Sequence, residues 1–184
     1  RPVVFQQFAL LPWATVTDNI AFGLELRGMG RPERLAIAGD LIHAMGLRGF
    51  ERHYPRQLSG GMQQRVGLAR ALAVNPAILL MDEPFASVDA QTRRTLQEDL
   101  LRLAERSRKT IVFVTHDIDE AVRLADRVVL MSPRPGRIVE SLPVPLPRPR
   151  PDDLDQASEA IRLKGYLWQR LRGMQQAQPP GARP

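Results

Sequence analysis

Apolar and polar residues along the chain follow two patterns, which together predict strands that alternate with helices. Two short runs dominated by apolar residues, 77–81 and 110–115, are typical of strands that a parallel sheet covers on both faces. Shorter strands are predicted at 3–5, 127–131 and around 137–140. Strands that alternate with helices indicate an α/β fold with a parallel sheet.

Helical spacing of apolar residues, with capping and breaking residues at its limits, predicts five helices before residue 126. The first begins near Thr17 and Asp18, either of which can cap it, and the second has Pro32 in its first turn and closes at Gly46. Asn75 ends the third, because a proline follows it. The last three predicted ranges are about 59–74, 90–107 and 119–125.

The last part of the chain has a composition of its own. Proline alternates with Val, Leu and Arg over 142–151, which predicts an extended, polyproline-like spacer. An amphipathic helix is expected to follow, and residues 174–184 are expected to be disordered. The apolar face predicted for that helix consists of Leu154, Ala157, Ile161, Trp168 and Leu171.

Bulk composition narrows the class of protein. The 184 residues are 43% hydrophobic and 25% charged, as in a globular domain, and no run approaches the roughly 20 apolar residues of a membrane span. Any membrane role is therefore expected to be peripheral. The absence of cysteine excludes disulfides and thiolate metal sites. The net charge of +6 does not favour a nucleic-acid partner, because the basic residues are scattered.

Polar side chains follow both of the strongly predicted strands. Asp82 and Glu83 come directly after the run 77–81, and His116 comes after 110–115. In parallel sheets, ligands bind beyond the carboxyl ends of the strands. One carboxylate could hold Mg²⁺ while the next polarises a water, although a strand that ends in polar residues at a surface would look the same.

A more specific motif is the signature octet, LSGGMQQR, at residues 58–65. Gly60 and Gly61 lie at the start of a predicted helix, where they expose backbone N–H groups, and Ser59 adds a hydroxyl. The helix dipole favours an anion at this end. The octet can therefore hold a terminal phosphate.

The signature octet, followed by Asp82-Glu83-Pro84 one helix and one strand later, resembles the signature of ABC-type ATPases. The resemblance implies a P-loop NTPase-like α/β domain with a parallel sheet core and an inserted α-helical subdomain. It also implies four regions. These are a Q-loop region (1–15), a helical subdomain ending in the signature helix (16–75), a catalytic core (76–141), and a Pro/Arg-rich linker with an amphipathic helix (142–184).

The same resemblance implies roles for individual residues around ATP and Mg²⁺. Gln6 matches the Q-loop glutamine, which touches Mg²⁺ and the attacking water, and is preferred to Gln7 because it directly follows the apolar strand end. Asp82 would hold Mg²⁺, Glu83 would be the general base, and His116 would contact the γ-phosphate.

The nucleotide-binding residues that the resemblance implies lie mostly in the signature octet. The D-loop aspartate that communicates across a dimer is matched by the last residue of Ala86-Ser87-Val88-Asp89, which departs from the usual Ser-Ala-Leu-Asp. The nucleotide-binding set is Ser59, Gly60, Gly61, Gln63 and Asp89.

The glycine-rich phosphate loop of this family, G-x-x-x-x-G-K-[ST], does not occur in the 184 residues. Lys109-Thr110 has the final pair of residues without the glycines. We expect roughly 80–90 residues carrying this loop to precede Arg1, from the usual size of α/β domains. These 184 residues alone are therefore expected to bind ATP weakly and to be inactive.

Three classes of ABC protein compete: a transport ATPase, a soluble ATPase acting on DNA or the ribosome, and a non-catalytic fragment or regulatory subunit. The compact helices between Gln6 and Leu58 favour an importer. Residues 5–13, 18–24 and 132–138 resemble the nitrate/sulfonate/bicarbonate (taurine-type) subfamily. That resemblance implies a homodimer on transmembrane permease subunits at the cytoplasmic face of the inner membrane. It also implies a substrate-binding protein as an indirect partner, a small anionic solute and no nucleic-acid partner.

Overall fold

The structure, a computed structural model, describes residues 3–4, 9–86, 88–107, 109–151 and 153–176. It divides into two units, residues 1–114 and 115–184, and each is described here by itself. The division falls inside the predicted catalytic core of 76–141.

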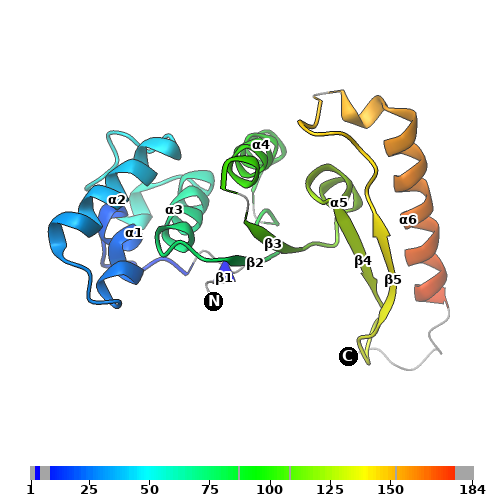
Figure 1. The fold of residues 1–184 in the computed structure, drawn as a ribbon, viewed down its shortest axis with the longest axis horizontal. Coiled ribbons are helices and arrows are strands. Elements are labelled where there is room, and N and C mark those ends of the chain that lie inside the picture. Colours follow the sequence, from blue (N-terminus) through cyan, green and yellow to red (C-terminus); the bar gives the residue numbers. More distant parts are fainter. Residues whose placement is uncertain (1–2, 5–8, 87, 108, 152, 177–184) are drawn as a thin grey trace. The chain divides into compact units, whose positions relative to one another are not determined.

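Three α-helices form the first part of unit 1: α1 (Val16–Glu25), α2 (Arg31–Ala44) and α3 (Gly60–Ala73), with a 3-10 turn at Pro55–Gln57 before α3 (Figure 1). Each α-helix contacts the other two. All three confirm the predicted helices within one to three residues. The expected cap of the first helix was wrong, because Thr15 is the N-cap and its side chain accepts the N–H of Asp18 at 3.2 Å.

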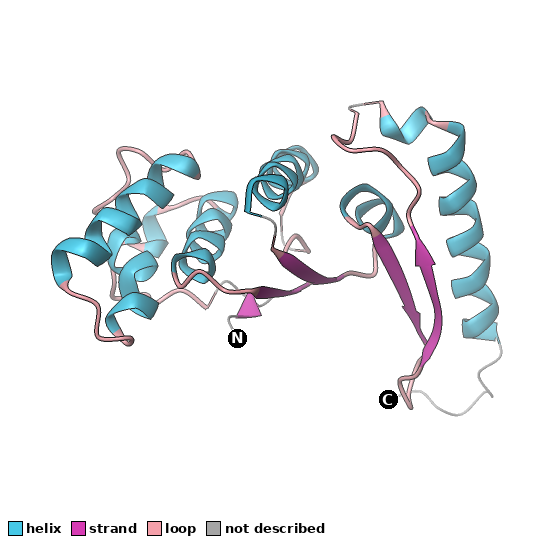
Figure 2. Ribbon diagram, viewed as in Figure 1, coloured by secondary structure: helices cyan, strands magenta, loops and turns pink. Residues whose placement is uncertain are grey.

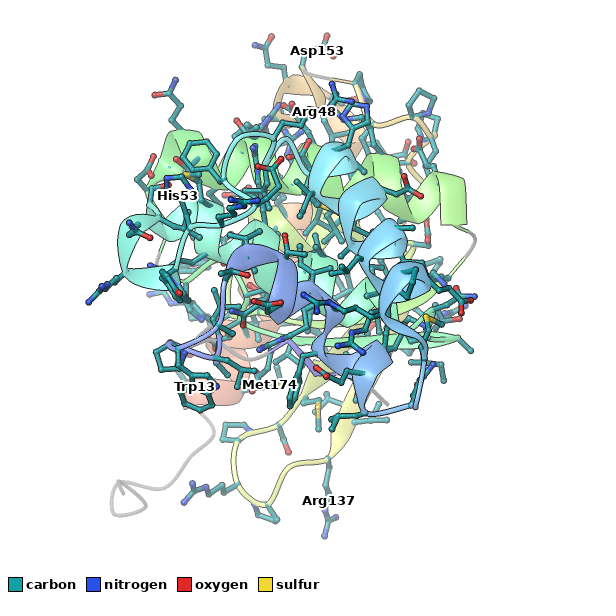
Figure 3. The ribbon with its side chains drawn as sticks, turned by 90° about the vertical axis from the view of Figure 1, so that its left-hand side faces the viewer. Trp13, Arg48, His53, Arg137, Asp153 and Met174 are labelled. Atoms are coloured by element: carbon teal, nitrogen blue, oxygen red, sulfur yellow. The ribbon has the colours of Figure 1, made fainter. Side chains whose placement is uncertain are left out.

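A fully buried asparagine joins the chain before α1 to this helix. The Asn19 Oδ1 accepts the N–H of Leu11 at 2.8 Å, and its Nδ2 donates to the carbonyls of Leu11, Ala14 and Thr15 at 3.0–3.1 Å. Buried amides need such partners. Nearby, Trp13 is 74% exposed and lies at the outside of the helices (Figure 3).

The second part of unit 1 is a parallel sheet in the order β1 (Val3–Val4), β2 (Ile78–Asp82) and β3 (Thr110–Val114). The helix α4 (Ala90–Ser107) connects β2 to β3, and lies on the same side of the sheet as α3, which it contacts (Figures 1 and 2). These elements confirm the predicted α/β fold with a parallel sheet.

The sheet differs from the prediction in the cover of its two faces. On one face Leu79 and Met81 are buried, whereas on the other Ile78, Val112 and Val114 are 39%, 47% and 51% exposed. Among the described residues, therefore, only one face of β2 and β3 is covered. The all-apolar sequence of β2 still suits a strand with two apolar faces.

Unit 2 contains α5 (Ile118–Leu124), the antiparallel strands β4 (Arg127–Met131) and β5 (Ile138–Pro143), a 3-10 turn (Leu154–Gln156) and α6 (Ser158–Gln176) (Figure 1). The predicted strand at 137–140 is thus longer than expected, and its end overlaps the start of the predicted spacer. The hydrophobic core of unit 2 is made of Val122, Val128, Leu130, Val144, Leu146, Leu154, Ala160 and Leu167.

Two expectations for the tail were wrong. The segment after β5 is not a spacer, because Val144 and Leu146 are buried in the core of unit 2. The predicted apolar face of α6 is also displaced, since Ile161 and Trp168 are 55% and 62% exposed while Leu167 is buried. Trp168 therefore does not have the packing role that was expected of it.

None of the described helices is both long enough and apolar enough to cross a membrane.

Candidate functional site

The signature octet begins α3 in the way the sequence predicts. Ser59 is the N-cap, and its Oγ accepts the N–H of Met62 at 3.3 Å. Its carbonyl accepts the N–H of Gln63 at 2.9 Å. The amides of Gly60 and Gly61 belong to the first turn, where N–H groups have no partner within the helix. Since Ser59 and Gly60 are exposed, a hydroxyl and backbone donors face outward at a helix N-terminus.

The two glycines of the octet differ in what surrounds them. A Cβ added to Gly60 would meet nothing within 4 Å, whereas a Cβ on Gly61 would lie 2.4 Å from Cγ2 of Thr92 in α4. Gly61 is therefore required by packing between α3 and α4. Gly60 has no such reason among the described residues, and the space beside it is open to a ligand.

Two further residues of the octet anchor α3. The Gln63 Nε2 donates to the carbonyls of Pro55 and Leu58 at 3.0 and 3.2 Å, and thereby fixes the turn before the helix. The guanidinium of Arg65 pairs with Asp99 of α4 at 3.2 Å. Gln63 was predicted to contact nucleotide. Its hydrogen bonds to Pro55 and Leu58 show that the amide nitrogen also stabilises the turn before α3.

The predicted D-loop aspartate caps α4. The Asp89 Oδ1 accepts the N–H of Thr92 at 3.0 Å, and its carbonyl accepts the N–H of Arg93 at 2.8 Å. The hydrogen bonds from Thr92 lower the pKa of Asp89. Because Thr92 also packs against Gly61, the start of the signature helix and the D-loop are held together.

The two adjacent carboxylates lie where β2 ends. Asp82 is its last residue and is exposed, and Glu83 is half-buried. The N–H of Glu83 donates to the carbonyl of Val114 at the end of β3, at 2.9 Å. The φ of Glu83 is +43°, a conformation that non-glycine residues seldom adopt and that is concentrated at functional sites.

His116 lies in unit 2, between two residues that cap α5. The Thr115 hydroxyl donates to Oε2 of Glu120 at 2.8 Å and accepts the N–H of Asp117 at 3.0 Å. Asp117 is the N-cap, and its Oδ1 accepts the N–H groups of Asp119 and Glu120 at 2.8 and 3.3 Å. His116 is exposed, and the network fixes the backbone on both sides of it.

The sequence did not reveal Thr92, Thr115 and Glu120 as supporting residues. Thr92 could not be found without the helix packing, but the Asp117-x-x-Glu120 spacing matches a helix N-terminus signature. Gln6 and Ser87 lie outside the described residues. His116 belongs to a different unit from Ser59, Glu83 and Asp89, and each unit is described by itself.

The described residues fit a nucleotide and Mg²⁺ in chemistry. Gly60 leaves open space at a helix N-terminus that favours a phosphate, and Asp82 presents an exposed carboxylate. No group of three or more His, Asp or Glu residues in the described part of the chain could hold a metal. One carboxylate suffices here, because Mg²⁺ is usually bound by one or two carboxylates together with substrate phosphates.

Comparison with known proteins finds relatives that are named as ABC transporter or ATP-binding proteins. The family model described as ABC transporter matches residues 2–86. The chain is 58% identical over 150 residues to the uncharacterized ABC transporter ATP-binding protein MJ0412 of Methanocaldococcus jannaschii, covering 82% of this chain and 56% of that protein. It is 53% identical over 144 residues to the taurine import ATP-binding protein TauB of Escherichia coli, covering 78% and 56% respectively.

Solved structures resemble the chain as well. A dimeric post-hydrolysis state of the ATP-binding cassette MJ0796, bound to ADP and Pi, matches with a TM-score of 0.66 and 37% identity, over 78% of this chain and 62% of that one. A second dimeric structure of MJ0796, a bacterial ABC transporter cassette, matches with a TM-score of 0.67. The chain thus spans less than two thirds of the length of each of these proteins.

Proposed function

Because the chain belongs to the ABC transporter family of ATP-binding proteins, we propose that it is part of the ATP-hydrolysing subunit of an ABC importer. The observation that carries the proposal is the pair of exposed groups at the start of α3, the Ser59 hydroxyl and the open side of Gly60. A helix N-terminus of this kind suits the γ-phosphate of ATP.

In this proposal the residues at the end of β2 perform the chemistry. Glu83 accepts or orients a proton of the attacking water, and its fixed backbone holds the carboxylate in place. Asp82 would hold Mg²⁺, which when bound would supply neutralisation of phosphate charge. His116 would contact the γ-phosphate, and Gln6 would contact Mg²⁺ and the water.

We propose that the working form is a homodimer with two composite ATP sites. Ser59, Gly60 and Gly61 of one subunit would face nucleotide held by the phosphate loop of the other, and Gln63 and Asp89 would support this contact. The dimers of the cassette MJ0796, one of them bound to ADP and Pi, favour the arrangement. The loop itself does not occur in these 184 residues, so the site needs further residues.

The partners follow from kinship with importers. We propose that the dimer binds transmembrane permease subunits at the cytoplasmic face of the inner membrane, with a substrate-binding protein on the far side. The 53% identity to a taurine import ATP-binding protein supports a small anionic solute such as taurine or another sulfonate, nitrate or bicarbonate. Uptake of labelled sulfonate, nitrate and bicarbonate by cells with and without the gene would distinguish these solutes. Unchanged uptake of all three in cells without the gene would refute the solute class.

The variant Glu83→Gln in the full-length protein tests the chemistry. We expect steady-state ATP hydrolysis to be abolished while ATP binding persists, because the amide cannot accept a proton. Glu105→Gln, at an exposed glutamate of α4, is the matched control and should hydrolyse ATP normally. Normal turnover by Glu83→Gln would overturn the assignment.

A further inference from the structure

The C-terminal part of unit 2 binds both ends of α5, the short helix that follows His116. This C-terminal clamp consists of residues 144–151 and 153–164, none of which was assigned to the nucleotide site. Its Val144 and Leu146 share a core with Val122 of α5. Its charged side chains contact α5 at positions that the core does not reach.

At the C-terminal end of α5, two arginines of the clamp take the place of a helix cap. The last carbonyls of a helix have no partner within it. The Arg150 guanidinium donates to the carbonyls of Arg123 and Ala125 at 3.3 and 2.7 Å, and Arg148 donates to that of Leu124 at 2.8 Å. A positive charge here also suits the helix dipole.

At the N-terminal end of α5, one lysine of the clamp bridges two aspartates. The Lys164 Nζ lies 2.6 Å from Oδ1 of Asp119 in the first turn of α5 and 2.6 Å from Oδ1 of Asp155. The other oxygen of Asp155 pairs with Arg123 of α5, also at 2.6 Å. The hydrogen bond from Lys164 holds the pKa of Asp155 at about 2, so the carboxylate is charged at neutral pH.

The contact at Asp119 leads directly to the residues beside His116. The N–H of Asp119 donates to the side chain of Asp117, which immediately follows His116. Glu120, the next residue, is 6% exposed and accepts the hydroxyl of Thr115, which immediately precedes His116. A shift of the first turn of α5 would therefore move the backbone on both sides of the histidine.

We propose that Lys164 is a positioning residue for His116, and that the C-terminal clamp sets the orientation in which this histidine is presented. The proposal rests on the proposed function for its link to hydrolysis, because only there does His116 contact the γ-phosphate. The coupling itself is a property of unit 2. Lys164 acts through Asp119 and does not touch the nucleotide.

A second ion pair of α6 provides a matched control. Arg170 pairs with Glu140 at 2.9 Å, so this pair joins the same helix to β5 rather than to α5. Replacing Arg170 removes an ion pair of similar length from α6 without touching the path to His116. A general loosening of α6 would show in both variants, whereas loss of the proposed coupling would show only at Lys164.

The test compares Lys164→Gln, Lys164→Arg and Arg170→Gln in the full-length protein. The first readout is the imidazole ¹H–¹³C resonance of His116 without nucleotide, assigned by its loss in His116→Gln. The second is the kcat and KM for ATP. Asp119→Asn breaks the same ion pair from α5 and serves as the second variant if Lys164→Gln does not fold.

We expect Lys164→Gln and Asp119→Asn to shift the His116 resonance, Lys164→Arg to restore it, and Arg170→Gln to leave it unchanged. For Lys164→Gln we expect kcat to fall about two- to fivefold at unchanged KM, as for loss of a partly exposed ion pair. The proposal would be overturned if the His116 resonance did not shift in Lys164→Gln, or if it shifted equally in Arg170→Gln. Full hydrolysis by His116→Gln would instead refute the role of His116 in the proposed function, and the resonance would still decide the coupling.

Discussion

Replacing Gly61 by alanine tests the packing between the signature helix and α4. The added Cβ would lie 2.4 Å from Cγ2 of Thr92, about 1 Å closer than the 3.4 Å at which ordinary contact begins. Within a helix threonine divides between only two χ1 rotamers, and here the hydrogen bond between the Thr92 side chain and Asp89 favours the observed one. The helices must therefore separate or the threonine must leave its preferred rotamer.

The expected cost can be separated from the general effect of replacing glycine. Overpacking of this kind costs about 1–3 kcal/mol. Exchanging glycine for alanine at a compatible backbone returns about 0.4–1 kcal/mol by restricting the unfolded chain. Gly60→Ala, one residue earlier in the same turn and with open space beside it, gains the second effect without the first. The difference between the two variants therefore measures the contact.

Urea denaturation followed by far-UV circular dichroism gives the free energy of unfolding of each variant. We expect Gly61→Ala to be less stable than Gly60→Ala by about 1–3 kcal/mol. Thr92→Ser removes Cγ2 but keeps the N–H that Asp89 accepts, so it should restore most of that loss in the double variant. Equal stability of the two alanine variants, or no rescue by Thr92→Ser, would refute the reasoning.

Two further predictions concern unit 2. Arg150→Met should lower the free energy of unfolding by about 2–4 kcal/mol, because the carbonyls of Arg123 and Ala125 lose a charged donor. The control is Arg162→Met, at an exposed arginine of α6. Equal urea midpoints for the two variants would contradict this prediction. Asp155 has its pKa lowered from 3.8 to about 2, so the folded state keeps it ionised where the unfolded chain takes up a proton. The stabilisation that the Asp155 carboxylate contributes is therefore present above pH 3.8 and lost as the pH falls toward 2. Urea titrations at a series of pH values should show that acid lowers the free energy of unfolding less in Asp155→Asn than in the wild type. An equal decrease in the two proteins would contradict the assignment.

The elements with strong local signals could be predicted from the sequence. The helix α3 begins after Ser59 and ends before Asn75-Pro76, and α4 has the same limits, 90–107, as its prediction. Caps and breakers act within one turn, so they need no knowledge of distant contacts. The cap of α1 was placed wrongly because Thr15, Thr17 and Asp18 are all good capping residues and only packing distinguishes them.

The tail could not be predicted in the same way. Prolines that alternate with apolar residues are typical of an exposed polyproline segment, yet here Val144 and Leu146 complete a core whose other members lie on α5, β4, the 3-10 turn at Leu154–Gln156 and α6. The face of α6 was misassigned because helical spacing groups Ile161 with Trp168 as readily as it groups Ala160 with Leu167, whereas burial depends on what lies opposite. Thr92 was missed for the same reason, whereas the spacing of Glu120 from Asp117 is a local signal that could have identified it.

The central claim, that Ser59 of one subunit completes the ATP site of the other, is tested most directly by mixing two inactive variants. In a heterodimer of Ser59→Arg and Glu83→Gln full-length subunits, composite sites would place both defects in one site and leave the other intact. Random mixing should then recover about a quarter of wild-type ATP hydrolysis, since half of the dimers are heterodimers with one intact site each. No recovery in a mixture shown to contain heterodimers would contradict the account, because sites built within one subunit would all carry a defect.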